Sequence, residues 1–468
     1  MSNRSRRLLI ALRLLCMLLI TLHLLAPLLR EDDTWGIWPY ATLRPLWRYL
    51  LASLALLACL PMPSSFLPGA GAPRVASRLR SAGRRLSERK ALLFALVALA
   101  SAPLFWFGRI VHTRWGDAYI LVNAIPHPQA RLTYNWQAPL DIFLHAKTWA
   151  WGHQLFGWED AMPAYWILST VAGVAFVWVL CRLSDAPGRS GAEKLLMLGL
   201  VASLGTMQLF FGYIESYTLI SLGVLAYLWL ASHTLRGEMD LLVPASMLAL
   251  THGFHPSTLV LQPSLWFLAW AVYKRGRLQV PGALLRVVAP SLVVGAGVLA
   301  LMECGGHGLH AFLGEDFPGG GDHRWLVPLL HTSTRWEHYT MFSWAHLRDI
   351  INQQLLAAPV VLPSLLLVRA LAGRRLEWRQ RWLTFLLIAA ACYLFLTLVW
   401  NPDYGGRRDW DLFAPASLPL TVLLATLLPQ ALPERGALRT GGRALIATQL
   451  MHSAAWIIHN TQPWSWPT

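Results

Sequence analysis

The chain has 468 residues, of which 55% are hydrophobic and only 13% are charged, and its mean hydropathy is +0.44. A soluble globular chain carries roughly twice that charged fraction. Apolar runs of roughly 18–25 residues recur along the chain, which is the length needed to cross about 30 Å of hydrocarbon. The composition therefore excludes a soluble protein and predicts an all-α, polytopic membrane protein.

The apolar runs predict about thirteen membrane spans. Their ranges are 8–29, 46–67, 91–108, 162–181, 194–212, 217–233, 241–251, 258–273, 287–303, 351–368, 382–400, 412–428 and 444–459. We divide the chain into three parts. Residues 1–90 hold two spans and a basic cytoplasmic loop, residues 91–430 form the main membrane module, and residues 431–468 hold a last span and a short outside tail.

The basic residues behind the net charge of +15 are distributed as the predicted topology requires. With the N-terminus inside, the inside loops carry 26 Lys and Arg residues, whereas the longer outside loops carry 12. Cytoplasmic loops are the basic ones in membrane proteins, so this orientation is consistent. The excess charge is explained by orientation and by attraction to anionic lipid, and no nucleic-acid partner is predicted. The five cysteines have neither metal nor disulfide spacing.

The first large outside loop, 109–161, carries Asp117 a few residues after an apolar run. An acid at this position can act as a general base on an acceptor hydroxyl. The alternative is a solvated acid or the N-cap of a helix that begins near Ala118. Segment 139–156 has apolar residues at helical spacing and predicts a helix that lies in the membrane interface. The Gly- and His-rich loop 304–350 predicts a flexible cover over a site.

The last outside loop, 401–411, packs the acids Asp403, Asp409 and Asp411 together with Arg407 and Arg408. Planar guanidinium groups suit a phosphate, so the two arginines are predicted to bind a donor phosphate. The alternative is a charge-balanced hairpin in which Asp411 caps the next span.

Three further polar residues interrupt apolar stretches. Glu215 lies at the membrane edge, where an ionisable group costs free energy and is therefore a functional candidate. The alternative is that Glu215 is a hydrogen-bonded structural acid. His252 and His255 would share a face of a helix, and they are predicted to donate hydrogen bonds to a phosphate or sugar hydroxyl. Two histidines without a third ligand are weak evidence for a metal site, so no metal ligand is assigned.

Three motifs together resemble the C-type glycosyltransferases (GT-C superfamily). They are Gly116-Asp-Ala-Tyr119, Gln137-Ala-Pro-Leu-Asp141 and Arg408-Asp-Trp-Asp-Leu-Phe413. The resemblance implies a GT-C-like fold and an inverting transfer of a hexosyl or pentosyl group from a polyprenyl-phosphate donor on the non-cytoplasmic face. Asp117 would be the catalytic base, with Glu215, Asp403, Asp409 and Asp411 as supporting acids. Many members carry two adjacent acids in the first loop, whereas this chain has only Asp117. No cofactor is assigned, and a role for a divalent cation stays open.

The expected partners are a polyprenyl-phosphate sugar, the bilayer, and a glycan, lipid or protein acceptor. We expect a bacterial inner membrane protein whose site faces the periplasm. The chain has no Walker loop, dinucleotide fingerprint or nucleophile elbow. Two alternatives stay open: a transporter or flippase with Glu215 and the histidines as a proton relay, and a non-catalytic subunit that presents lipid or glycan. The candidate residues fall on one face, which favours the enzyme.

Overall fold

The computed structural model describes residues 1–60, 90–129, 132–314 and 324–464. Most of the basic loop that was predicted near the N-terminus, and the Gly-rich turn near residue 320, lie outside these residues. The regular secondary structure of the described residues is helical, and their one β feature is an isolated antiparallel bridge between Leu326 and Trp400. The prediction of an all-α protein is confirmed.

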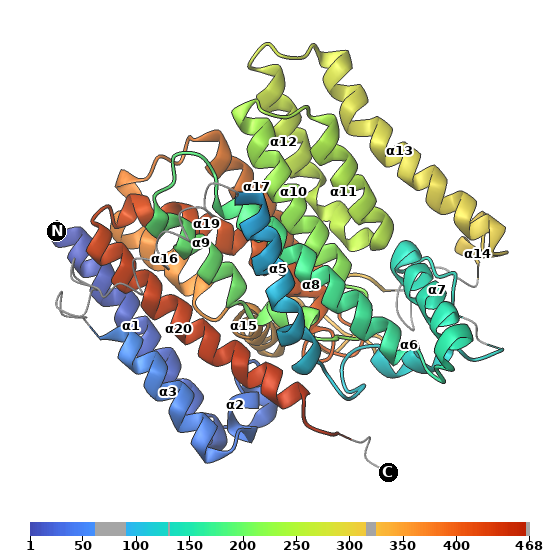
Figure 1. The fold of residues 1–468 in the computed structure, drawn as a ribbon, viewed down its shortest axis with the longest axis horizontal. Helices are drawn as coiled ribbons and strands as arrows, with labels where there is room; N and C mark the ends of the chain where they lie inside the picture. The colour runs from blue at the N-terminus through green and yellow to red at the C-terminus, as the bar shows by residue number, and fades with distance from the viewer. Residues whose placement is uncertain (61–89, 130–131, 315–323, 465–468) are drawn as a thin grey trace.

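Figure 1 shows the helices as a layered bundle. They are α1 (Asn3–Leu25), α2 (Pro39–Thr42), α3 (Pro45–Cys59), α5 (Lys90–Phe107), α6 (Ala118–Ala124), α7 (Pro139–Phe156), α8 (Met162–Ser184), α9 (Gly191–Ala202), α10 (Thr218–Arg236), α11 (Leu242–Phe254), α12 (Gln262–Tyr273), α13 (Val280–Cys304), α14 (Leu309–Phe312), α15 (Trp344–Ala357), α16 (Val361–Ala372), α17 (Arg381–Val399), α18 (Trp410–Phe413), α19 (Ser417–Ala431) and α20 (Arg435–Asn460).

Seven helical segments in the described residues are long and apolar enough to cross a membrane, or eight if the pair α15 and α16, bent by 96°, counts as one broken span. Several predicted spans are shorter elements: α3 has 15 residues and α11 has 13. Two others, α9 and α12, each adjoin a 3-10 helix. Hydropathy records apolar content, whereas helix length also depends on where Gly and Pro interrupt the backbone. The count of thirteen is therefore not reproduced.

The helices differ in how much of their surface the bundle covers. The segment of α18 and α19, Trp410–Ala431, is central, with 89% of its apolar window buried, whereas α13 has only 17% of its window buried. Figure 1 shows α13 at the edge of the molecule, with α14 at its end near α7. One side of α13 therefore faces its surroundings and the other side faces α11 and α12.

A second apolar cluster, separate from the core of the bundle, lies under the outside loops. Three tryptophans in it, Trp115, Trp410 and Trp456, are at most 2% exposed. Their indole N–H groups donate to the Asn460 side chain, the Tyr213 hydroxyl and the Gly36 carbonyl, at 3.0, 2.7 and 3.2 Å. A buried indole N–H needs such a partner. These bonds fix the outside loops against one another, and they join segments from all three predicted parts of the chain.

The predicted interface helix is present as α7. Trp151, Leu155 and Phe156 are exposed, as an apolar face toward lipid requires. Two polar residues of the helix, Asp141 and His145, are buried and lie 3.1 Å apart, with the imidazole stacked on a tyrosine of α8. This helix therefore packs its polar side inward.

Candidate active site

A cavity of about 740 Å³ lies where the outside loops meet the membrane helices. Its wall comes from loop 109–161, from the turns after residues 214 and 251, from segment 324–326 and from the hairpin 400–412. The predicted site residues on this wall are Asp117, Glu215, His252, His255, Asp403, Asp409 and Asp411. Residues more than 290 positions apart are therefore brought to one place, and of the predicted set only Arg407 and Arg408 are absent from the wall.

Asp117 occupies the N-cap position of α6, but its side chain makes no capping hydrogen bond. The neighbouring Tyr404 hydroxyl and Arg408 guanidinium instead act on the carboxyl and lower its pKa. A capping role therefore does not explain the residue. Gly116, at φ +47°, turns the chain here, and its N–H donates to the Arg408 carbonyl at 3.1 Å. The hairpin 401–411 thus holds the Asp117 loop.

Glu215 supports the same loop from the other side. Its Oε1 accepts the backbone N–H of Asp117, and a Cβ added to Gly116 would overlap the carboxylate. Gly116 is therefore required both by its positive φ and by the close approach of Glu215. The alternative of a hydrogen-bonded structural acid therefore has a partner in the structure, which is the backbone of Asp117.

The acids around Asp117 hold their protons more tightly than in water. Burial raises the pKa of Asp117, while the Tyr404 hydroxyl and the Arg408 cation act in the opposite direction. Burial, with nearby carboxylates, holds the pKa of Glu215 and of Asp409 well above the ordinary range. Like charges in a desolvated site oppose ionisation. Of these three acids, Asp117 has the cation and the hydroxyl that favour its ionised form.

The two histidines differ in their hydrogen bonding. In His252, Nε2 lies 2.9 Å from the Gln262 amide nitrogen and therefore accepts, so Nδ1 carries the proton and donates to Thr258 at 2.8 Å. Both of its nitrogens are occupied. In His255, Nδ1 accepts the Ser257 N–H at 3.1 Å, which leaves the proton on Nε2. That Nε2 is buried and has no hydrogen-bond partner among the described residues.

The two histidines do not share a helical face. His252 is in α11, whereas His255 follows the helix end in an extended conformation, with φ −156° and ψ 126°. The i, i+3 argument for this pair was therefore wrong. The free donor of His255 and the occupied ring of His252 distinguish the two residues.

The two arginines also separate. The Arg407 guanidinium is bonded to Glu31, lies 3.8 Å from Asp32 and stacks over Trp38, so the predicted phosphate role of Arg407 has no geometric support. The guanidinium of Arg408 lies 4.7 Å from the centre of the Tyr404 ring, next to Asp117. Arg408 is therefore placed to influence Asp117.

Sequence reasoning missed several residues on the cavity wall, of which Arg324, Asn401 and Tyr404 are the most polar. Arg324 is bonded at 3.0 Å to Glu337, which is buried. Its position next to the Gly-rich stretch of an outside loop, at Arg324-Trp325, is a signal that could have indicated it. Asn401 and Tyr404 lie in the hairpin 401–411, of which only the charged residues were predicted to belong to the site.

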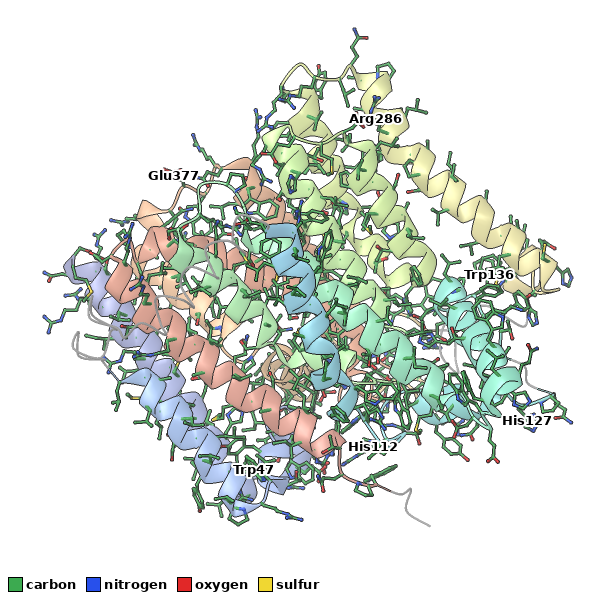
Figure 2. All side chains as sticks on the ribbon, viewed as in Figure 1. Trp47, His112, His127, Trp136, Arg286 and Glu377 are labelled. Carbon is green, nitrogen blue, oxygen red and sulfur yellow. The ribbon has the colours of Figure 1, made fainter. Side chains whose placement is uncertain are left out.

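Much of the remaining cavity wall is apolar. This part of the wall comes from the membrane helices α13 and α17 and from the 3-10 helix after α11. The residues are Leu259, Val260, Val294, Val298, Phe395 and Val399. Trp136 closes one side, where its ring packs 4.7 Å from Phe312 of α14, and Figure 2 shows Trp136 beside the end of α13. The wall of one cavity thus carries both the carboxylates and an apolar groove formed by these residues of the membrane helices.

Metal binding was considered for the same acids. Among the residues that the structure describes, no group of three or more His, Cys, Asp or Glu side chains has the arrangement of a metal site.

Comparisons with known proteins gave one similar solved structure. It is the crystal structure of ArnT from Cupriavidus metallidurans bound to undecaprenyl phosphate, with 11% sequence identity and a TM-score of 0.46 over 78% of this chain and 77% of that chain. A likeness at this level carries no conclusion about activity. No family model matches the chain, and no curated protein matches it.

Proposed function

We propose that the protein is a GT-C-type membrane glycosyltransferase, which transfers a sugar from a polyprenyl-phosphate donor to an acceptor on the non-cytoplasmic face. The observation that carries this proposal is the cavity that joins Asp117 to an apolar groove between membrane helices. A polyprenyl-phosphate sugar has the same two parts, because its sugar and phosphate are polar and its chain is apolar. A water-soluble donor has no apolar chain for the groove to bind.

Asp117 is the general base in this proposal. It lies on the cavity wall, and the Tyr404 hydroxyl and the Arg408 cation favour its ionised form. An ionised carboxylate can take the proton from an acceptor hydroxyl. Glu215 positions the Asp117 backbone, and burial raises the pKa of its own carboxyl well above the ordinary range.

The donor phosphate lies near His255 and Arg324. The free Nε2–H of His255 can donate to a phosphate oxygen, and Arg324 supplies a cation on the same wall. This assignment replaces Arg407, which is absent from the cavity wall, and His252, whose two ring nitrogens are both hydrogen-bonded. Fixed donors at a leaving phosphate favour its departure, since they meet the charge as it develops.

The reaction is a single displacement with inversion. The acceptor oxygen loses its proton to Asp117 and forms a bond to the anomeric carbon. The bond from that carbon to the phosphate oxygen breaks, and both electrons leave with the polyprenyl phosphate. No redox partner or nucleotide is needed.

The first test is sugar transfer by the purified protein from a panel of radiolabelled polyprenyl-phosphate sugars. We expect Asp117→Asn to lower turnover by about 100-fold or more. Asp32→Asn is a matched control, because Asp32 is an exposed outside acid. Near-full activity of Asp117→Asn would contradict its role as the base. A wild-type protein that binds lipid phosphate but transfers no sugar would instead favour the transporter or the presenting subunit.

A further inference from the structure

The hairpin that follows α17 carries a polar group with no evident structural use. The Asn401 side chain is 2% exposed and lies on the cavity wall. Its Nδ2 donates to the Trp336 carbonyl at 3.1 Å. Its Oδ1 is buried and has no hydrogen-bond partner among the described residues. Burying an amide oxygen without a partner costs free energy, so such a group calls for an explanation.

The orientation of this amide is fixed by its neighbour. The Trp336 carbonyl can only accept, so the nitrogen of Asn401 must face it and the oxygen must face the other way. The oxygen is therefore an acceptor without a donor. The group that completes it has to bring an O–H or N–H.

The chemistry of that acceptor excludes a phosphate. An ionised phosphate has oxygens that only accept, and Asp403, Asp409 and Asp411 line the same part of the wall. A hydroxyl satisfies the Asn401 oxygen and tolerates the acids, since it can donate to either. The phosphate is better placed at the free N–H of His255, in a different turn.

Two indole rings flank this position. Trp400 precedes Asn401, and its ring lies parallel to that of Trp325, with 10° between the planes and 6.2 Å between the centroids. Both line the cavity. Two backbone hydrogen bonds hold the arrangement, from Asn401 N–H to the Trp325 carbonyl and from Val327 N–H to the Val399 carbonyl, both at 2.9 Å. The aromatic wall is thus built into the fold.

We infer that Asn401, Trp400 and Trp325 form the subsite for the sugar of the donor, an inference that rests on the proposed glycosyltransferase function. Sugars combine C–H faces, which pack on aromatic rings, with hydroxyls at the rim, which need acceptors. The Asn401 oxygen accepts one sugar hydroxyl, and the indoles pack on the ring. The subsite selects the sugar, whereas His255 binds the phosphate.

The experiment compares two ligands on the full-length protein in detergent or nanodiscs. One is bare polyprenyl phosphate, and the other is the polyprenyl-phosphate sugar that the wild type uses. Asn401→Ala should weaken binding of the sugar-bearing lipid by about three- to tenfold, the effect of one lost hydrogen bond, and leave the bare lipid unchanged. Trp400→Leu should do the same, which covers the case that Asn401→Ala does not fold.

Asn123→Ala is the matched control, because Asn123 is an exposed amide of the first outside loop and is not on the cavity wall. It should leave both affinities unchanged. If the wild type prefers the sugar-bearing lipid and Asn401→Ala and Trp400→Leu keep that preference, the subsite is refuted and the proposed function stands. Equal weakening of both ligands by the two variants also refutes the subsite. A wild type that binds neither lipid refutes the proposed function and the subsite together.

Discussion

At the scale of single residues, Asp117 is subject to two opposing influences. Burial raises the pKa of its carboxyl, and the neighbouring Arg408 cation lowers it. A general base works only when it is ionised. The pH at which activity falls on the acid side therefore reports the balance between the two.

Arg408→Gln removes the cation and should raise the pKa of Asp117. In a plot of transfer rate against pH, the fall on the acid side should then move to higher pH. The reason is that the base is protonated at a higher pH. Initial rates of transfer across the acid range measure this shift. Arg407→Gln loses the same charge outside the cavity and should leave the acid-side fall in place. An unchanged acid-side fall in Arg408→Gln would contradict the electrostatic role.

Glu215→Gln should keep most of the activity, since glutamine resembles the protonated acid and retains an oxygen for the Asp117 N–H. Its effect on stability depends on pH. Because the folded-state pKa of Glu215 is raised, its contribution to stability is present at low pH and is lost as the pH rises through that pKa. Thermal unfolding should show the variant gaining on the wild type as the pH increases. Parallel curves at all pH values would speak against a protonated Glu215.

His255→Ala should weaken binding of bare polyprenyl phosphate by about tenfold, because it removes a hydrogen bond to a charged group. His252→Ala should chiefly lower thermal stability, since its ring joins Thr258 to Gln262. Affinity measurements on both variants, with unfolding curves, separate the two. Equal losses of affinity would mean that the hydrogen-bond assignment of the rings is wrong.

At the scale of elements, the outside segment between α1 and α3 holds the hairpin 401–411 in place. Glu31 is bonded to Arg407 and lies 3.2 Å from Arg114. Two cations from different loops thus share one carboxylate. Burial lowers the pKa of Arg407 to about 10, and an opposite charge nearby favours the charged form of a buried group.

Glu31→Gln should therefore leave two half-buried cations facing each other. We expect a loss of about 1–2 kcal/mol in unfolding free energy, less than for a buried pair since all three groups are partly exposed, and a lower transfer rate. Denaturant or thermal unfolding and transfer assays measure the two effects. Asp32→Asn is the control at 80% side-chain exposure. If the Glu31 variant behaves like that control, Glu31 does not hold the hairpin 401–411 in place.

At the scale of the whole molecule, every predicted site residue on the cavity wall comes from a segment assigned to the outside or to its membrane edge. The basic loops, such as those between α12 and α13 and between α16 and α17, lie away from the outside segments around α6 and α7 in Figure 1. This separation agrees with the charge argument made from the sequence.

The orientation can be tested with a native cysteine. Cys304 is exposed at the end of α13, whereas Cys16, Cys59 and Cys181 are buried. A membrane-impermeant maleimide should label the wild type in intact cells and not label Cys304→Ser. Ala186→Cys, placed in a predicted inside loop of that variant, should be labelled only after permeabilisation. The reverse pattern would invert the topology and place the cavity on the cytoplasmic side.

The sequence by itself determined the features that depend on composition and local pattern. The apolar runs indicated helices, the bounds of the helix 139–156 were predicted correctly, and seven of the predicted polar residues lie on the cavity wall. Hydropathy and periodicity are properties of neighbouring residues, so they can be read without a fold. They could not show where spans shorten or bend, because helix ends and breaks depend on packing as well.

Only the tertiary structure decided which polar atoms are free. Arg407 and Arg408 are adjacent and chemically identical, yet one is engaged by Glu31, far away in the sequence, and the other lies beside Asp117. His252 and His255 separate in the same way, since one ring is saturated and the other is not. Asn401 became a candidate only because the Trp336 carbonyl fixes its amide. Hydrogen-bond partners are set by contacts between distant segments, and these contacts exist only in the folded chain.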